Sequence, residues 1–263
     1  MERELPTYII NGTKFIVDID KGEIRQKDQE NNVIRFCDMS YTNSGYSFPY
    51  DTVIRNLPIG IHSNPVKEVE IPMQVVLDPV GIAEKHNLPV ESLNRKTDYD
   101  ILVNPELVQK RLNGVLPVID IAGQDFIVDY RMNELRPKDD FSTSIRLNDL
   151  YYDYGEEKYK AFYQPATHSV IPIDPATVTE VPDGLVQIEF PMECALDPIA
   201  AARDFEMDMK VMLLKHPPKE KHTAKVIPIE RTNIPSLVEK NRQRGNHQEQ
   251  PGNDQHRKQR RAM

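Results

Sequence analysis

The sequence predicts an α+β protein made of two tandem repeats of a small module, each an antiparallel β-sheet closed by a C-terminal helix. When the 263-residue chain is aligned with itself at a shift of 111 positions, residues 5–41 give 16 identities in 37 ungapped positions. Both copies contain short β-rich runs separated by turn residues. Both then reach an Asp-Pro pair, which is typical of a helix start. We therefore expect one module to be used twice.

The first element of each copy is predicted to be a β-hairpin. Residues 8–18 are two β-rich runs around Asn11-Gly12, a dipeptide that favours a type I′ turn because both residues accept positive φ. The second copy has Ala122-Gly123 at this turn, so the hairpin is expected but its turn type is left open. A second reversal at residues 20–22 or 131–133 leads to a third short strand.

Further strands are expected downstream in both copies. Residues 33–36 and 144–147 form the next strand, and the aromatic stretches 41–50 and 151–163 suit a hairpin arm. Residues 66–71 and 185–190 alternate apolar and polar side chains, as in a strand with one solvated face. After an eight-residue insertion in the second copy, this part aligns at a shift of 119, which pairs Glu70 with Glu189.

Proline positions predict the helices. Asp78-Pro79 and Asp197-Pro198 each provide an N-cap followed by proline at the first helical position, and Asn104-Pro105 starts a further helix that ends near Gly114. The Met-rich residues 206–216 fit a helix and a strand equally well. The expected organisation is residues 1–88 as the first module, 89–114 as a linker with a short helix, 115–216 as the second module with a C-terminal extension, and 217–263 as a polar, basic, disordered tail.

Charge is distributed unevenly along the chain. The formal net charge is −8, but residues 240–263 carry +5, so the preceding residues carry −13. An acidic body repels a phosphate backbone, so nucleic-acid contacts would have to come from the tail. The candidate contacts are Lys240, Arg242, Arg244, Arg257, Lys258, Arg260 and Arg261.

Sequence motifs of catalysis and metal binding are missing. There is no phosphate-binding glycine loop, paired CxxC, HExxH or nucleophile elbow, and none of the seven histidines recurs in the other copy. We expect no catalytic, cofactor-binding or metal-binding residue. Cys37 and Cys194 also lack counterparts and are expected to be small buried hydrophobic residues. Two cysteines, no secretory signal and no long apolar run predict a soluble, cytoplasmic protein with no membrane contact.

The polar and aromatic residues that recur in both copies are the remaining site candidates. They are interpreted first as turn caps, cross-strand ion pairs and core residues, and alternatively as an interaction surface. The candidate surface consists of Arg25, Arg35, Asp38, Tyr41, Arg136, Arg146, Asp149 and Tyr152.

The pattern of the second copy resembles a known but uncharacterised family. Residues 116–129 read LPVIDIAGQDFIVD and are followed by Glu134-Leu135-Arg136-Pro137, which is similar to a bacterial family of duplicated LPxxxIxGxxFxVD modules often linked to mobile genetic elements. The first copy departs from it at Ile9 and Gln26. The resemblance covers both modules and implies no established activity.

Two functions from different classes are therefore expected. The first is a non-catalytic protein-interaction or scaffold protein whose partner is another protein. The alternative is a nucleic-acid-associated accessory factor of a mobile element, anchored by the basic tail. An enzyme is the third alternative, and no small-molecule ligand is expected.

Overall fold

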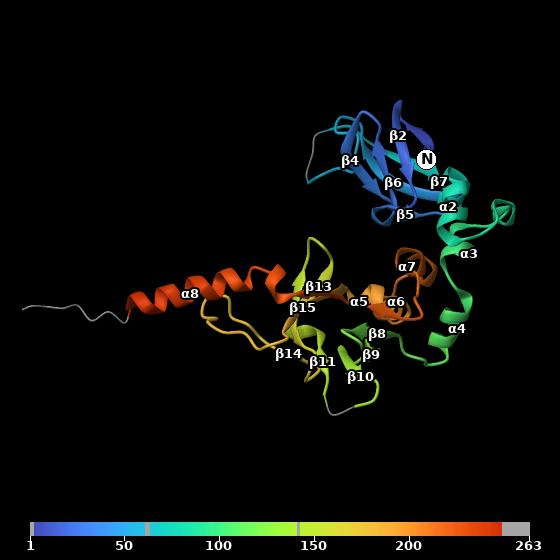
Figure 1. Ribbon diagram of the computed structural model, residues 1–263. Helices are drawn as coiled ribbons and strands as arrows, with labels where there is room; N and C mark the ends of the chain where they lie inside the picture. Colours follow the sequence, from blue (N-terminus) through green and yellow to red (C-terminus); the bar gives the residue numbers. More distant parts are fainter. Residues whose placement is uncertain (1–2, 61–63, 141–142, 249–263) are drawn as a thin grey trace, which may run out of the picture. The chain divides into compact units, whose positions relative to one another are not determined.

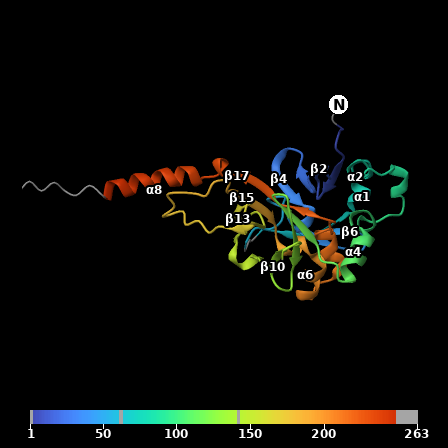
Figure 2. The ribbon, with the colours of Figure 1, turned by 60° about the horizontal axis from the view of Figure 1, so that its bottom comes forward.

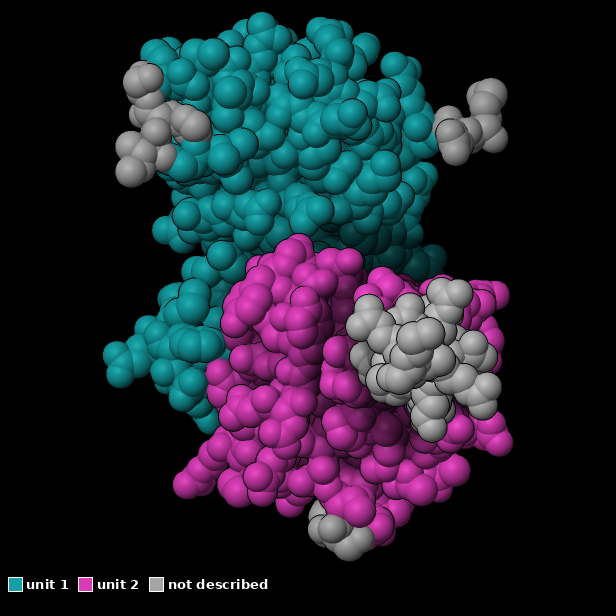
Figure 3. All heavy atoms as spheres, turned by 90° about the vertical axis from the view of Figure 1, so that its left-hand side faces the viewer, with its two compact units in different colours: residues 1–115, 198–218 teal, residues 116–197, 219–263 magenta. Residues whose placement is uncertain are grey.

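The computed structural model of the chain describes residues 3–60, 64–140 and 143–248. They divide into two compact units, residues 1–115 with 198–218 (unit 1) and residues 116–197 with 219–263 (unit 2). The structure has several antiparallel sheets and short helices, so the predicted α+β class is confirmed (Figures 1 and 3).

Unit 1 starts with a four-stranded antiparallel sheet in the order β1-β2-β3-β4. Asn11 and Gly12 connect the first two strands with φ values of 45° and 81°, as a type I′ turn requires. A short 3-10 helix, Phe36–Asp38, leads to a three-stranded sheet in the order β5-β6-β7. The strands are β1 (Thr7–Ile10), β2 (Thr13–Asp18), β3 (Glu23–Gln26), β4 (Gln29–Arg35), β5 (Ser40–Tyr41), β6 (Gly45–Asp51) and β7 (Val66–Pro72).

The core of unit 1 combines both sheets with the first helices. Phe15 and Tyr50 meet edge to face with ring centroids 6.4 Å apart, and both are fully buried. Asp78 caps α2 as predicted, because its side chain accepts a hydrogen bond from the Gly81 N–H. The helices of unit 1 are α1 (Gln74–Leu77), α2 (Pro79–His86), η2 (Val90–Leu93), α3 (Asp98–Leu102), α4 (Pro105–Leu112), α6 (Pro198–Asp204) and α7 (Met209–Lys215).

Two predictions about domain membership differ from the structure. Residues 198–216, expected to end the second module, and residues 217–218, expected to begin the tail, belong to unit 1, and so does α4, expected to belong to neither module. The reason is non-local: Ile199 of α6, Leu213 of α7 and Val103 before α4 share one buried apolar cluster. Asp197-Pro198 encodes where the helix starts but not which body it packs against. Within residues 206–216, which fit a helix and a strand equally well by sequence, Met209–Lys215 forms the helix α7.

Unit 2 begins with the same succession of hairpins. Strands β8 to β11 form a sheet extended by β16 in the order β11-β10-β9-β8-β16, and β12, β13, β15 and β17 form a second sheet in which β14 also pairs with β13. Ala122 and Gly123 have φ values of 53° and 91°, so this turn is also type I′. The strands are β8 (Val118–Ile121), β9 (Gln124–Asp129), β10 (Glu134–Pro137), β11 (Ile145–Arg146), β12 (Tyr151–Asp153), β13 (Lys158–Gln164), β14 (Ser169–Val170), β15 (Val186–Pro191), β16 (His222–Thr223) and β17 (Lys225–Pro228).

The prediction of a disordered tail from residue 217 is wrong for residues 222–248. His222–Thr223 pairs in parallel with β8, and Lys225–Pro228 pairs antiparallel with β15. The composition is polar because these strands add to sheet edges and contribute little to the core. They are followed by η4 (Ile229–Arg231) and α8 (Ile234–Gln248), which extends away from the sheets of unit 2 in both ribbon views (Figures 1 and 2). The other helices of unit 2 are η3 (Leu147–Asp149) and α5 (Glu193–Leu196).

Candidate functional site

The recurring aspartate–arginine pairs hold the second reversal of each unit. In unit 1, Arg25 Nη1 donates to Asp18 Oδ2 at 2.6 Å, and Asp18 Oδ1 accepts the Lys21 N–H. Burial alone would raise the pKa of Asp18, but the hydrogen bonds from Arg25 and Lys21 outweigh it and hold this pKa below its usual value. In unit 2, Arg136 Nη2 donates to Asp129 Oδ2 at 2.7 Å. Arg25 and Arg136 are thus engaged in cross-strand pairs next to a turn.

The other predicted surface residues lie apart from these pairs. Arg35 is exposed at the end of β4, and Asp38 ends the following 3-10 helix, where its Oδ1 accepts from the Cys37 thiol. Tyr41 packs edge to face on Tyr46, with Lys210 Nζ 5.4 Å from its ring centroid. In unit 2 the equivalent positions are the exposed Arg146, the exposed Asp149, and Tyr152, whose ring contacts Tyr154 and Tyr159.

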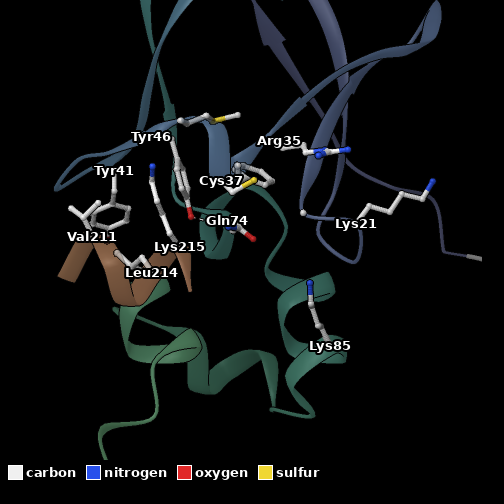
Figure 4. A pocket seen from close by; sticks show the side chains of 13 residues that line it. Lys21, Arg35, Cys37, Tyr41, Tyr46, Gln74, Lys85, Val211, Leu214 and Lys215 are labelled. Atoms are coloured by element: carbon white, nitrogen blue, oxygen red, sulfur yellow. Dashed lines mark hydrogen bonds between the residues drawn. The ribbon is translucent and has the colours of Figure 1, made fainter. Parts of the chain in front are cut away.

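A cavity of about 300 Å³ in unit 1 brings Arg35 and Tyr41 together (Figure 4). Tyr46 and Gln74 hydrogen-bond to each other within it, and Val211 and Leu214 of α7 form one side. Four cationic side chains also line it: Lys21, Arg35, Lys85 and Lys215. They do not converge, because Lys21 and Arg35 extend away from α7 and Lys85 Nζ donates to the Ile19 and Asp20 carbonyls. The four cationic side chains therefore do not form a cluster that could bind one anion together.

Cys37 lines the same cavity, and the prediction that it is buried is wrong. Its side chain is exposed, whereas Cys194 is buried as predicted. The Cys37 thiol is not activated, because partial desolvation and then the neighbouring Asp38 carboxylate raise its pKa. A raised pKa keeps the sulfur protonated and poorly nucleophilic at neutral pH.

Asp98 is a buried carboxylate of unit 1 that accepts hydrogen bonds from two other elements, and the sequence did not single it out. It is 1 % exposed, and its Oδ2 accepts the Tyr46 hydroxyl at 2.6 Å and the Gln74 N–H at 2.8 Å. Its Oδ1 accepts the Val75 N–H, so Asp98 caps α1 from 24 residues away. The Thr97/Asp100 capping box marks the start of α3 in the sequence, but no local signal links Asp98 to α1.

Unit 2 contains a groove of about 690 Å³. Its lining is mainly apolar and comes from β12, β13 and the segment after β14. Tyr151 stands on its border with 66 % of its surface exposed, and Asp149 marks one polar position. Lys160, also in the lining, pairs with Asp153 at 2.7 Å. The apolar part of the lining is Leu150, Tyr151, Ala161, Phe162, Val170, Ile171, Pro172, Ile173 and Pro175.

The basic C-terminal residues are only partly described. Lys240, Arg242 and Arg244 lie on α8 and are exposed, and Arg242 Nε also donates to the Thr179 carbonyl at 2.7 Å. Asn241 is buried and donates to the carbonyls of Pro175 and Val178. Arg257, Lys258, Arg260 and Arg261 lie outside the described residues.

The described ranges also bear on metal binding and on membrane spanning. Within them, no three or more His, Cys, Asp or Glu side chains are grouped in a way that would hold a metal ion. No helix in the described part of the chain combines the length and apolar character needed to cross a bilayer. Comparisons with models of known protein families, with curated proteins and with solved structures find no match to this chain.

Proposed function

We propose that this chain is a non-catalytic protein-interaction protein and that the groove of unit 2 binds an extended apolar segment of a partner protein. The groove carries the proposal. Its lining is mainly apolar and includes two prolines, and an exposed tyrosine on its border is the residue type enriched at interface cores. Asp149 is exposed at the groove and favours a partner with a basic residue at that position.

We also propose that the two units derive from one duplicated module used as a scaffold. Equivalent contacts support this interpretation. Phe126 and Tyr163 meet at 6.4 Å with an interplanar angle of 73°, the same values as Phe15 and Tyr50. The Asp18–Arg25 pair likewise has an equivalent in Asp129–Arg136. What recurs is core packing and turn geometry, and the large groove is described only in unit 2.

The recurring charged residues support a non-catalytic role. General acid–base catalysis needs carboxylates placed to exchange a proton with a substrate, in a cleft that shifts their pKa toward neutrality. Asp18 instead has a lowered pKa and is paired with Arg25. Asp18 therefore stays ionised, and its bonds to Arg25 and to the Lys21 N–H stabilise the hairpin.

The proposal is tested by affinity capture from the native host, followed by identification and purification of the captured protein. We expect the purified partner to bind the full chain directly. Replacing Tyr151 by Ser should weaken binding at least about tenfold, since a buried tyrosine at an interface contributes roughly 1.4 kcal/mol or more.

Tyr154→Ser is the matched control. Tyr154 is even more exposed, at 86 %, but does not line the groove. Its replacement should leave the affinity unchanged. Capture of no specific protein, or equal losses for both variants, would count against the groove as the interaction site.

A second candidate is a nucleic-acid-associated accessory factor of a mobile genetic element. The observation that favours it is α8, which extends from unit 2 and exposes Lys240 and Arg244. Affinity of this origin is electrostatic and falls steeply as salt rises. A chain ending at Glu239 should lose DNA or RNA binding in an anisotropy assay, and the full chain should lose it between 50 and 200 mM salt, by about 10³-fold for six contacts. Equal binding by both chains rejects this candidate.

A further inference from the structure

Strands β7 and β15 occupy equivalent positions in their sheets but differ at the outer edge. Each pairs on one side with its unit's aromatic strand, β6 or β13. On its other side, β15 pairs with β17. Throughout the described ranges, β7 pairs with β6 alone and ends the sheet. An uncovered edge strand presents N–H and C=O groups that can pair with another chain.

The side chains reflect this difference. Glu189 of β15 is 8 % exposed and pairs with Lys225 of β17 at 3.1 Å. Its counterpart in β7, Glu70, is exposed, and so are Val66, Lys67 and Glu68. Unit 1 has kept the acidic residue that faces lysine in unit 2, and no described cation pairs with it.

We propose that the free edge of β7 binds an extended segment of a partner protein, which adds to the sheet as an antiparallel strand. This proposal rests on the proposed interaction function and specifies a second binding surface for it. Strand addition derives affinity from main-chain hydrogen bonds and specificity from alternate side chains. As a template, the pairing of β17 with β15 in unit 2 shows which main-chain bonds and which opposing side chains such an added strand would have.

The template defines the chemistry of the partner segment. Opposite Glu189, Ile188 and Gln187 stand Lys225, Val226 and Ile227. If the partner segment pairs with β7 in the register that β17 has on β15, a basic residue of the segment lies opposite Glu70. Two apolar residues of the segment then lie opposite Val69 and Glu68. The acidic excess along β7, Glu68 and Glu70 against Lys67, favours a basic segment.

A second copy of the chain fits this edge less well than a basic segment. Antiparallel pairing of β7 with itself can place Lys67 opposite Glu70, but it also places Glu68 opposite Val69. That pairing brings no new basic residue to the edge and leaves one acidic residue of each strand without a cation opposite it. A partner strand that contains lysine supplies the additional positive charge that this acidic edge lacks.

The probe is a fluorescein-labelled peptide with the sequence of residues 219–230, measured by anisotropy with the full-length protein. In that protein the edge of β15 is already covered by β17. We expect the peptide to bind and to slow amide hydrogen exchange in residues 66–72. The variant Glu70→Lys should weaken binding at least about fivefold, because like charges then lie directly opposite. A peptide with Glu in place of its Lys225-equivalent should recover that affinity on the variant.

Glu30→Lys is the matched control, because Glu30 is an exposed acidic residue on β4, the edge strand of the other sheet of unit 1. It should bind like the unchanged protein. Absence of peptide binding overturns the strand-addition proposal, as does binding that Glu70→Lys leaves unaltered. A dimer of the full chain that Glu70→Lys dissociates also overturns it, because the occupant is then a second copy. None of these outcomes affects the partner capture through Tyr151, so the two proposals fail separately.

Discussion

Ala122 and Asn11 occupy equivalent turn positions with nearly the same backbone angle, so the two turns differ in residue type and not in geometry. Ala122 has a φ of 53°, in the left-handed region where a residue with a Cβ is disfavoured, while unit 1 has Asn11 in the equivalent place. Asparagine tolerates this conformation through local hydrogen bonding. Ala122→Asn should therefore raise the free energy of unfolding by about 0.5–1 kcal/mol. The reverse change, Asn11→Ala, should lower it by a similar amount. Urea unfolding curves test both, and a neutral result for the pair would show that turn strain is negligible here.

Asp98 is a buried acceptor that joins three residues of unit 1 in one hydrogen-bond network. It accepts bonds from Tyr46, Gln74 and Val75 while nearly fully buried. Replacing it with Asn turns one acceptor oxygen into a donor that faces other donors. We expect Asp98→Asn to lower the free energy of unfolding by about 2 kcal/mol or more.

Asp100→Asn is the comparison for Asp98, because Asp100 accepts only the local bonds of an exposed capping box. Asp100→Asn should lower the free energy of unfolding by about 1 kcal/mol or less. Denaturant unfolding of the two variants gives the ranking. If Asp100→Asn lowered the free energy of unfolding more than Asp98→Asn did, the buried network would not be the main support of α1.

At the scale of elements, β16 introduces a pH dependence. His222 is 4 % exposed, and burial, followed by the charge of Lys219, lowers its pKa to about 4. The unfolded chain takes up a proton at an ordinary imidazole pKa of about 6.5, which the folded chain does not. The stabilisation is therefore complete above pH 6.5 and is lost as the pH falls toward 4, by on the order of 3 kcal/mol in total.

His222→Gln isolates this contribution from carboxylate titration. Urea midpoints at pH 7.5 and pH 5 should differ less in the variant than in the unchanged protein. An equal difference in both proteins would mean that folding does not change the pKa of His222.

Local elements were predictable from the sequence to the extent that local chemistry determines them. The hairpin at Asn11-Gly12 and the helices after Asp78-Pro79 and Asn104-Pro105 follow from turn and cap residues, and the structure contains all three. The strands β16 and β17 were missed because they contribute main-chain pairing with little apolar patterning. Of the site candidates, Arg35 and Tyr41 line one cavity and Asp149 lines the groove, but Asp98 depends on a contact 24 residues away that no local pattern encodes.

At the scale of the whole molecule, the assignment of α6 and α7 to unit 1 has a measurable consequence. Leu213 of α7 is 1 % exposed and packs with Val103 and Ile199 of that unit. Leu213→Ala should lower the stability of unit 1 by about 2–5 kcal/mol, because it leaves a cavity in this cluster. Since α7 lies between the two segments of unit 2 in the sequence, an organisation by chain order would instead place the loss in unit 2.

Hydrogen exchange read by mass spectrometry separates these alternatives, because amides report the opening free energy of the body they belong to. Leu213→Ala should speed exchange in β6 and leave β13 unchanged. Ile188→Ala, a fully buried position in the core of unit 2, is the matched control and should do the opposite. Faster exchange in both strands for either variant would show that the two units unfold as one cooperative body. Faster exchange in β13 alone for Leu213→Ala would return α7 to unit 2.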